Sequence, residues 1–168
     1  MFNAPQNLVE LFQVGMDRTI PNFHNTIPRD FIQLNLGAGN KIVVPAKSLD
    51  LPEWDADTML IPYEDGQVTT IHMYHFLEHV KDPIAVLREC ERVLKPNGFC
   101  NIVVPYYRSQ MAYHDLDHKH FFTEDTWKIL FDTPYYGKHG EWRFEIGLNV
   151  IMGIAERNLA LVTQLIKR

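Results

Sequence analysis

A glycine bend followed closely by a carboxylate is the first pattern in the sequence that could hold a ligand. The strand-like residues Leu34–Leu36 lead into Gly37-Ala38-Gly39, where the backbone can turn tightly and approach a ligand without a Cβ in the way. Asp50 ends the next strand-like run, where a carboxylate can accept ribose hydroxyls. The dinucleotide fingerprint needs a further glycine three residues on, but the chain has Ile42 there. The pattern favours a ligand with one adenosine and no diphosphate over NAD.

A second pattern combines two histidines with a glutamate. His75-Phe76-Leu77-Glu78-His79 fits H-x-x-E-H, in which one helix face presents two histidines to zinc. A helix is predicted to begin only at Pro83, so a continuous helix through this motif is not expected. Magnesium is also disfavoured, because His75 is a softer ligand than the oxygens that magnesium prefers. We expect Glu78 and His79 to orient the loop through hydrogen bonds, with no metal.

The segment Tyr113–Phe121, with the sequence YHDLDHKHF, contains three histidines and two aspartates. Asp117, His118 and His120 could bind a metal, since these residue types are common ligands. They could equally brace the loop through local hydrogen bonds. A third interpretation places His118 or His120 in the pocket as a substrate anchor or general base, because histidine titrates near neutral pH. We take these two histidines as catalytic candidates and predict no metal.

The elements that must position these residues follow from periodicity and capping. Strands are predicted over Phe31–Leu36, Ala46–Leu51, Val68–Tyr74 and Phe99–Val104. Helices are predicted from Pro83, behind the cap Asp82, and after the cap Thr123. An antiparallel hairpin is predicted over Trp142–Ile154 and Leu159–Ile166. Strands that alternate with helices indicate an α/β fold with a mostly parallel sheet, and such sheets bind ligands beyond the carboxyl ends of their strands.

Composition limits the class of protein. The chain has 168 residues and is 46% hydrophobic, with 16 Lys+Arg against 21 Asp+Glu and a formal charge of -5. We expect a single domain, with residues 1–30 as a lid or dimerisation segment and residues 31–168 as the core. The two cysteines, Cys90 and Cys100, lie in a helix-like and a strand-like run, which favours a reducing, cytoplasmic setting. No segment has the length and apolarity of a membrane span or a signal peptide.

Four motifs carry a family resemblance: "LNLGAGN", "DTMLIPYEDGQVTTIHMYHFLEHV", "DPIAVLRECERVLKPNGFCNIVV" and "DHKHFFTEDTWKIL". Together they span about Phe31 to Leu130 and resemble class I S-adenosylmethionine-dependent methyltransferases, especially small ones related to the quinone-biosynthesis enzymes. The resemblance implies a Rossmann-like methyltransferase fold, a seven-stranded sheet and S-adenosyl-L-methionine as cofactor. It also implies methyl transfer to a small molecule or to a sugar- or lipid-like acceptor.

The resemblance also implies a set of cofactor-binding residues: Leu36, Gly37, Ala38, Gly39, Asn40, Asp50, Leu51, Asp57, Thr58, Met59 and His75. Asp50 would accept the ribose hydroxyls and Asp57 the adenine amino group. His75 would face the methionine end and the transferred methyl, and it is a third catalytic candidate beside His118 and His120. Because a sulfonium methyl is already electrophilic, the protein chiefly has to align donor and acceptor and remove a proton where required. The whole interpretation depends on Asp50 and Asp57 converging with the glycine bend.

Tyr106 and Tyr107, with His79, are predicted to line a substrate pocket. The run "VPYY", Val104–Tyr107, is similar to the proline-tyrosine motif of amino-directed DNA methyltransferases, but it follows a different strand and lacks the leading polar residue. The acidic balance of the chain also disfavours nucleic acid as a partner. We expect a small-molecule substrate, neither a nucleic-acid nor a membrane partner, and leave a homodimer open.

The sequence departs from the family between its first two predicted strands. Asn40–Lys47 is too short for a normal crossover helix, so the first helix is expected to be reduced or missing. One face of the sheet would then need cover from Leu8, Leu11 and Phe12 or from a second subunit. A catalytically inactive binding or assembly module that keeps the fold is therefore the alternative function.

Overall fold

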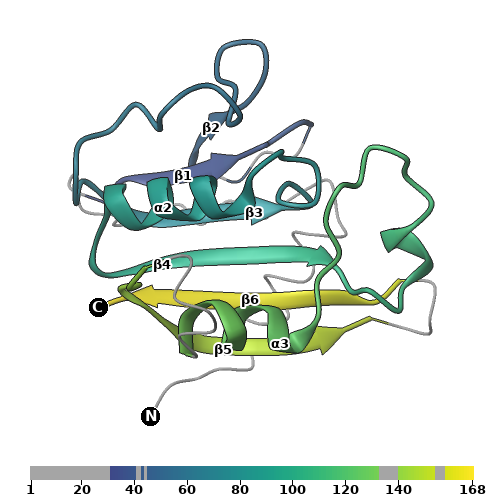
Figure 1. The fold of residues 1–168 in the computed structure, drawn as a ribbon. Coiled ribbons are helices and arrows are strands. Elements are labelled where there is room, and N and C mark those ends of the chain that lie inside the picture. Colours follow the sequence, from purple (N-terminus) through teal and green to yellow (C-terminus); the bar gives the residue numbers. More distant parts are fainter. Residues whose placement is uncertain (1–30, 41–42, 44, 133–139, 154–157) are drawn as a thin grey trace.

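The computed structural model describes residues 31–40, 43, 45–132, 140–153 and 158–168. They form a six-stranded sheet in the order β2-β1-β3-β4-β6-β5 (Figure 1). The strands are β1 (Gln33–Leu36), β2 (Lys47–Leu49), β3 (Val68–Tyr74), β4 (Leu94–Pro105), β5 (Phe144–Met152) and β6 (Ala160–Lys167). The first four pair in parallel, and β6 runs antiparallel to β4 and β5. The predicted parallel sheet with a C-terminal antiparallel hairpin is confirmed, and a seventh strand is not among the described residues.

The two central strands, β3 and β4, are rich in apolar and β-branched residues that suit a sheet covered by neighbours. β3 has the predicted bounds, but β4 begins before the predicted Phe99, at Leu94, which pairs with Val68. The register then shifts before the pair of Thr70 with Phe99. Residues 95–98 therefore form an irregularity inside β4, where Asn97 has a φ of 64°.

Helix α2 (Pro83–Val93) begins where the sequence predicts it. One oxygen of Asp82, Oδ1, accepts the backbone N–H groups of Ile84 and Ala85 at 2.9 and 3.0 Å. These N–H groups have no acceptor within the helix, so the carboxylate stabilises the first turn. The side of α2 that faces the sheet is buried and contains Val86, Leu87, Cys90 and Val93.

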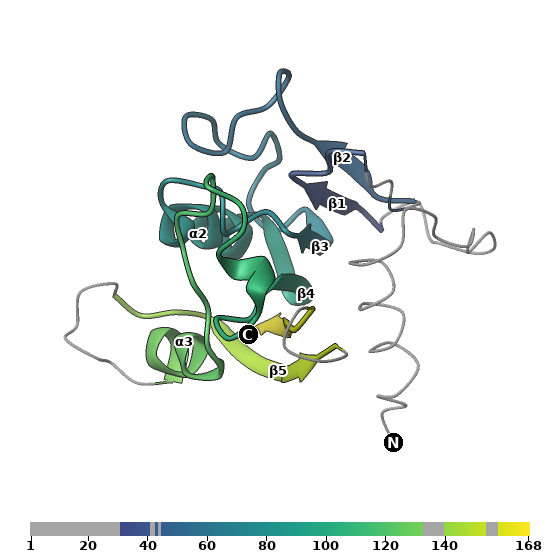
Figure 2. The same ribbon diagram turned by 90° about the vertical axis from the view of Figure 1, so that its right-hand side faces the viewer.

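A second short helix lies on the same face of the sheet as α2. It is α3 (Glu124–Trp127), followed by a wider helical turn over Lys128–Asp132, and Figure 2 shows both helices on one side of the strands. Trp127 anchors this segment, because its ring stacks on Phe122 and Phe131 with ring centroids 5.5 and 6.2 Å apart. No helix in the described ranges is long and apolar enough to cross a membrane.

The connections at the carboxyl ends of β1, β2, β3 and β4 lie at one edge of the sheet, where the predicted site residues occur. Between β1 and β2, the described residues contain no helix, which agrees with the expected loss of the first crossover helix. The predicted cover from Leu8, Leu11 and Phe12 lies outside the described residues. The connection from β4 to α3 includes a 3-10 turn, Gln110–Ala112, and lies at the carboxyl end of β4 (Figure 1).

Candidate active site at the carboxyl edge of the sheet

The glycine bend has the conformation that its sequence predicts. Gly37 and Gly39 have φ angles of 62° and 48°, in the left-handed region that glycine adopts without penalty. A Cβ on Gly39 would meet no atom within 4 Å, whereas a Cβ on Gly37 would lie 1.9 Å from the ring of Phe76. The bend is therefore open above Gly39 and packed against an aromatic ring at Gly37.

Asp50 closes this bend from the end of β2. Its Oδ2 accepts the backbone N–H of Gly39 at 2.5 Å, and its Oδ1 accepts the N–H of Leu51 at 2.8 Å. A carboxylate oxygen has more than one acceptor position, so each oxygen can still accept a hydroxyl from a ligand. The structure thus places Asp50 against the glycine bend.

Asp57 lies in the loop between β2 and β3 and is directed toward another segment. Its Oδ1 accepts the backbone N–H of Lys81 at 2.7 Å, and its Oδ2 lies 4.0 Å from the Lys81 ammonium. Thr58 donates its hydroxyl to Asp55 at 3.1 Å. Asp57 therefore ties its own loop to the segment that precedes α2, and no hydrogen bond joins it to the described residues of the glycine bend.

Three large apolar side chains in this part of the chain are exposed to solvent. Leu51, Met59 and Leu60 are 67%, 48% and 70% exposed. Met59 and Leu60 line a cavity of about 230 Å³ between this loop and α2. Exposed apolar residues that gather beside a cavity are typical of a ligand-binding surface.

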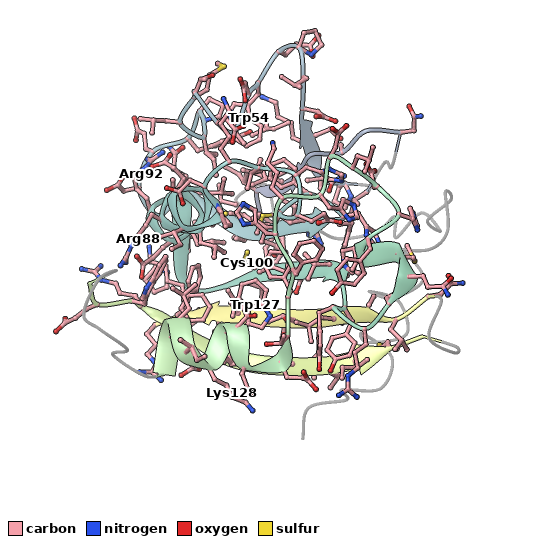
Figure 3. The ribbon with its side chains drawn as sticks, turned by 45° about the vertical axis from the view of Figure 1, so that its right-hand side comes forward. Trp54, Arg88, Arg92, Cys100, Trp127 and Lys128 are labelled. Carbon is pink, nitrogen blue, oxygen red and sulfur yellow. The ribbon has the colours of Figure 1, made fainter. Side chains whose placement is uncertain are left out.

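Arg92 of α2 fixes the end of this loop. Its guanidinium donates to the carbonyl oxygens of Tyr63 at 2.8 Å and Ile61 at 3.0 Å, and it pairs with Glu89 at 2.8 Å and Asp65 at 3.0 Å. The hydrogen bond from Arg92 is also the largest factor that lowers the pKa of Glu89. In Figure 3, Arg92 and Arg88 lie near each other along α2, and Arg92 extends toward the loop that contains Trp54.

His75 directly follows β3 and is strained. Its φ is 53°, a conformation that costs energy for a residue with a Cβ. Its Nδ1 lies 3.2 Å from Glu78 Oε1, and its Nε2 is buried with no partner among the described residues. The motif His75–His79 is a turn rather than a helix, as expected, so it does not form the two-histidine helix face of a zinc hydrolase.

The histidine-rich loop packs against this turn. The backbone N–H of Lys119 donates to the carbonyl of Glu78 at 2.7 Å, and the His120 ring bonds the carbonyl of Val80 through Nε2 at 2.9 Å. The rings of His79 and His118 meet edge to face, with centroids 4.7 Å apart. Residues 75–80 and 113–120, which are separate motifs in the sequence, therefore form one junction.

The two tyrosines predicted to line a substrate pocket have different surroundings. Tyr106 is buried and donates its hydroxyl to Glu124 of α3 at 3.0 Å. Burial, followed by this contact, raises the pKa of Tyr106 to about 12. Tyr107 is half-buried, and its hydroxyl accepts a hydrogen bond from Arg108 at 2.9 Å. Tyr106 thus connects β4 to α3, and Tyr107 is the more accessible of the two.

Two features of the site could not be read from the sequence. Phe76 packs on Gly37, and the Glu78 carboxylate is buried with Oε2 unpartnered among the described residues. Both depend on contacts between segments far apart in the chain. The sequence shows only that Phe76 and Glu78 lie inside the H-x-x-E-H run. Neither residue type at that position indicates a contact with a distant segment.

Comparison with known proteins agrees with this fold. Residues 30–102 match the family model described as a methyltransferase domain. No curated protein sequence matches the chain. A similar solved structure is the S-adenosylmethionine-dependent methyltransferase of Thermotoga maritima, with 16% identity, a TM-score of 0.56, and coverage of 96% of this chain and 89% of that one.

Two further solved structures, both described as S-adenosylmethionine-dependent methyltransferases, are similar over most of their length. The one from Aquifex aeolicus has 14% identity, a TM-score of 0.57, and coverage of 99% and 90% of the two chains. The one from Methanosarcina mazei has 17% identity, a TM-score of 0.56, and coverage of 89% and 98%. These solved structures share the fold of this chain, and residues 30–102 match the methyltransferase-domain model.

Proposed function

We propose that the protein transfers a methyl group from S-adenosylmethionine to a small molecule or to a sugar- or lipid-like acceptor. The observation that carries this proposal is the contact between Asp50 and the N–H of Gly39, beside open space above that glycine. A bend without side chains and a carboxylate beside it suit the ribose and methionine parts of one adenosine-bearing ligand. The family match and the methyltransferase fold support the same cofactor.

The residues present fit the cofactor along the edge of the sheet. Asp50 would accept the ribose hydroxyls, and the exposed Leu51 and Met59 would contact the adenine face. Asp57 would use its remaining acceptor positions for the adenine amino group while it holds the Lys81 N–H. The backbone from Leu36 to Asn40 would lie under the methionine and ribose.

When bound, the cofactor supplies a methyl group that is already electrophilic. The protein then has to hold the acceptor in line and exclude water. Glu78 would fix the ring of His75 through Nδ1. The buried Nε2 of His75 could then receive a hydrogen bond from the hydroxyl or amine of the methyl acceptor. His79, half-buried beside the same turn, would contact the acceptor. His118 and His120 hold the neighbouring loop, and His118 is the nearer of the two to His79.

Exposed aromatic rings support an acceptor with an apolar or ring-shaped face. Tyr113 and Phe121 stack with centroids 4.8 Å apart and are 59% and 48% exposed. Leu116, between them in sequence, is 98% exposed. Tyr107, just past the end of β4, is half-buried. Such surfaces pack against sugar rings or acyl chains, which also expose C–H groups.

Calorimetry tests the cofactor, and a transfer assay tests the reaction. We expect S-adenosylmethionine and its demethylated product to bind the full chain with micromolar affinity and Asp50→Ala to abolish binding. Glu53→Ala, an exposed acid in the same loop, should bind as the unaltered chain does. Label from methyl-tritiated cofactor should then appear on members of a panel of sugars, lipids and small amines or phenols. Absence of heat with either ligand would contradict the proposal and favour the non-catalytic module.

A further inference from the structure

We propose that Glu78, His79 and His118 bind one divalent transition-metal ion of the zinc type, at the junction of residues 75–80 with residues 113–120. One ligand atom from each of the three side chains lies within 4.8 Å of the other two. Zinc bonds to nitrogen and oxygen ligands are about 2.0–2.2 Å long, so small rotamer adjustments bring all three atoms to one centre.

The strongest support is the carboxylate of Glu78. The residue is fully buried, and its Oε1 contacts His75 while its Oε2 has no partner among the described residues. Leaving half of a buried carboxylate without a hydrogen bond or a cation is costly, so an unpartnered oxygen of this kind calls for an explanation. A cation at Oε2 would supply the missing partner.

His118 is held in the orientation that a metal ligand requires. Its Nδ1 bonds the carbonyl of Ala112 at 3.1 Å, and because a carbonyl only accepts, this nitrogen carries the proton. Nε2 is left with a free lone pair. Metal-bound histidines commonly donate their other ring N–H to a backbone carbonyl in this way. The contact thus fixes both the tautomer and the direction of the lone pair.

Asp115 adds negative charge at the same place. Its Oδ2 lies 4.0 Å from His118 Nε2. The side chain of Asp115 is partly exposed, and its Oδ1 accepts the backbone N–H of Asp117 at 2.9 Å. It can approach the ion directly or through a water, which would complete four ligands.

The donor set selects the kind of ion. Two imidazole nitrogens and a carboxylate suit zinc, cobalt or iron, whereas magnesium and calcium prefer oxygen ligands alone. The proposed set also differs from the H-x-x-E-H pattern, because His75 contributes no ligand and His118 comes from a different loop. The ion would join the turn after β3 to the loop after β4.

The competing explanation is that the contact of His75 with Glu78 is by itself enough to hold the buried carboxylate. The two explanations differ in what they require of His118. A purely local ion pair between His75 and Glu78 does not need His118, whereas a metal centre loses a ligand when His118 is replaced. Variants at His118 therefore distinguish them.

The test uses the full chain, treated with chelator, and zinc alone as the probe, with no methyl donor present. We expect competition against a chromophoric chelator to show one zinc per chain, and cobalt to give the visible absorption of a four-coordinate ion. His118→Gln and His79→Gln should each weaken zinc affinity by about tenfold or more. His114→Gln, an exposed histidine of the same loop, is the matched control and should bind as the unaltered chain does.

The melting temperature is a second readout, because a variant that does not fold would also fail to bind zinc. Zinc should raise the melting temperature of the unaltered chain and of His114→Gln but not that of His118→Gln, because binding to the folded state stabilises it. The proposal is overturned if zinc does not bind, or if the His79 and His118 variants retain full affinity. Cofactor calorimetry is a separate measurement, so failure here leaves the proposed function standing.

Discussion

The side chain of Asp50 reaches back from β2 to the N–H of Gly39, with 2.5 Å between Oδ2 and the amide nitrogen. The acid and the glycine bend therefore form one unit, although they come from different strands. Because β1 and β2 pair in parallel, their carboxyl ends meet at the same edge. The contact also holds the carboxylate in place before a ligand arrives, which lowers the entropy lost on binding.

This relationship predicts the effect of Asp50→Asn on cofactor binding. The amide keeps the shape of the carboxylate but removes its charge and one of its two acceptor oxygens. Hydrogen bonds to charged groups contribute about 1.5–3 kcal/mol, so we expect S-adenosylmethionine affinity to fall about tenfold to a hundredfold. Calorimetry measures the change. Glu53→Gln, which removes an exposed charge from the same loop, should change the affinity less than twofold, and an equal loss in both variants would contradict a specific role for Asp50.

The sequence predicted the parts of the fold that depend on local patterns. β3 has the predicted bounds and α2 begins at Pro83 behind Asp82, because β-branched runs and capping residues act within a few positions. The bend at Gly37–Gly39 was also predicted, because it depends only on glycines that are close together in the sequence. The start of β4 at Leu94 was not predicted, because the pairing of Leu94 with Val68 brings together segments that are distant in sequence.

The candidate site was predicted less completely, for the same reason. Asp50 lies at the bend as expected, but Asp57 bonds the N–H of Lys81 instead of any described residue of the bend. The meeting of His79 with His118 was missed, since each belonged to a separate motif. Contacts of this kind depend on how loops pack, and no spacing within either motif encodes them.

A pair of glycine variants separates the structural role from the ligand-binding role of the bend. Gly37→Ala should destabilise the fold by about 2–4 kcal/mol, because it combines a left-handed φ with overlap against Phe76. Gly39→Ala has a left-handed φ but open space, so we expect about 1 kcal/mol. Urea unfolding measures both values.

Gly39→Ala should affect cofactor affinity more than it affects the stability of the fold. A methyl group there would project into the open space that we assign to the ligand, so Gly39→Ala should weaken S-adenosylmethionine binding while the protein remains folded. Unchanged affinity in folded Gly39→Ala protein would show that the cofactor does not approach this glycine.

Arg92→Ala should loosen the loop that leads into β3. The variant removes the hydrogen bonds to the carbonyls of Ile61 and Tyr63, and it leaves Glu89 without its main partner. The contact with Asp65 contributes little, because that side chain is 81% exposed. We expect a loss of about 2–3 kcal/mol in the free energy of unfolding. Hydrogen exchange of residues 57–65 should increase as well.

Arg143→Ala serves as the control for Arg92→Ala. Arg143 is exposed, and it contacts Glu91 through its backbone N–H, which the substitution keeps. We expect a change below about 0.5 kcal/mol, as for surface positions generally. A similar loss in both variants would mean that the loop does not depend on the Arg92 guanidinium.

His72 predicts how stability changes with pH. It lies on β3, with Nδ1 2.8 Å from the Tyr74 hydroxyl and Nε2 3.4 Å from Gln33, and burial lowers its pKa from 6.5 to about 4. Between pH 4 and pH 6.5 the unfolded chain binds a proton at His72 that the folded chain does not. The contribution of His72 to the free energy of unfolding is therefore fully present above pH 6.5 and is lost as the pH falls toward 4. The loss is at most about 3 kcal/mol, at 1.36 kcal/mol for each pKa unit. Urea unfolding from pH 7 to 4 should therefore show a shallower decline for His72→Asn than for the unaltered chain, whatever its stability at pH 7. Parallel curves for the two proteins would show that His72 titrates normally in the folded state.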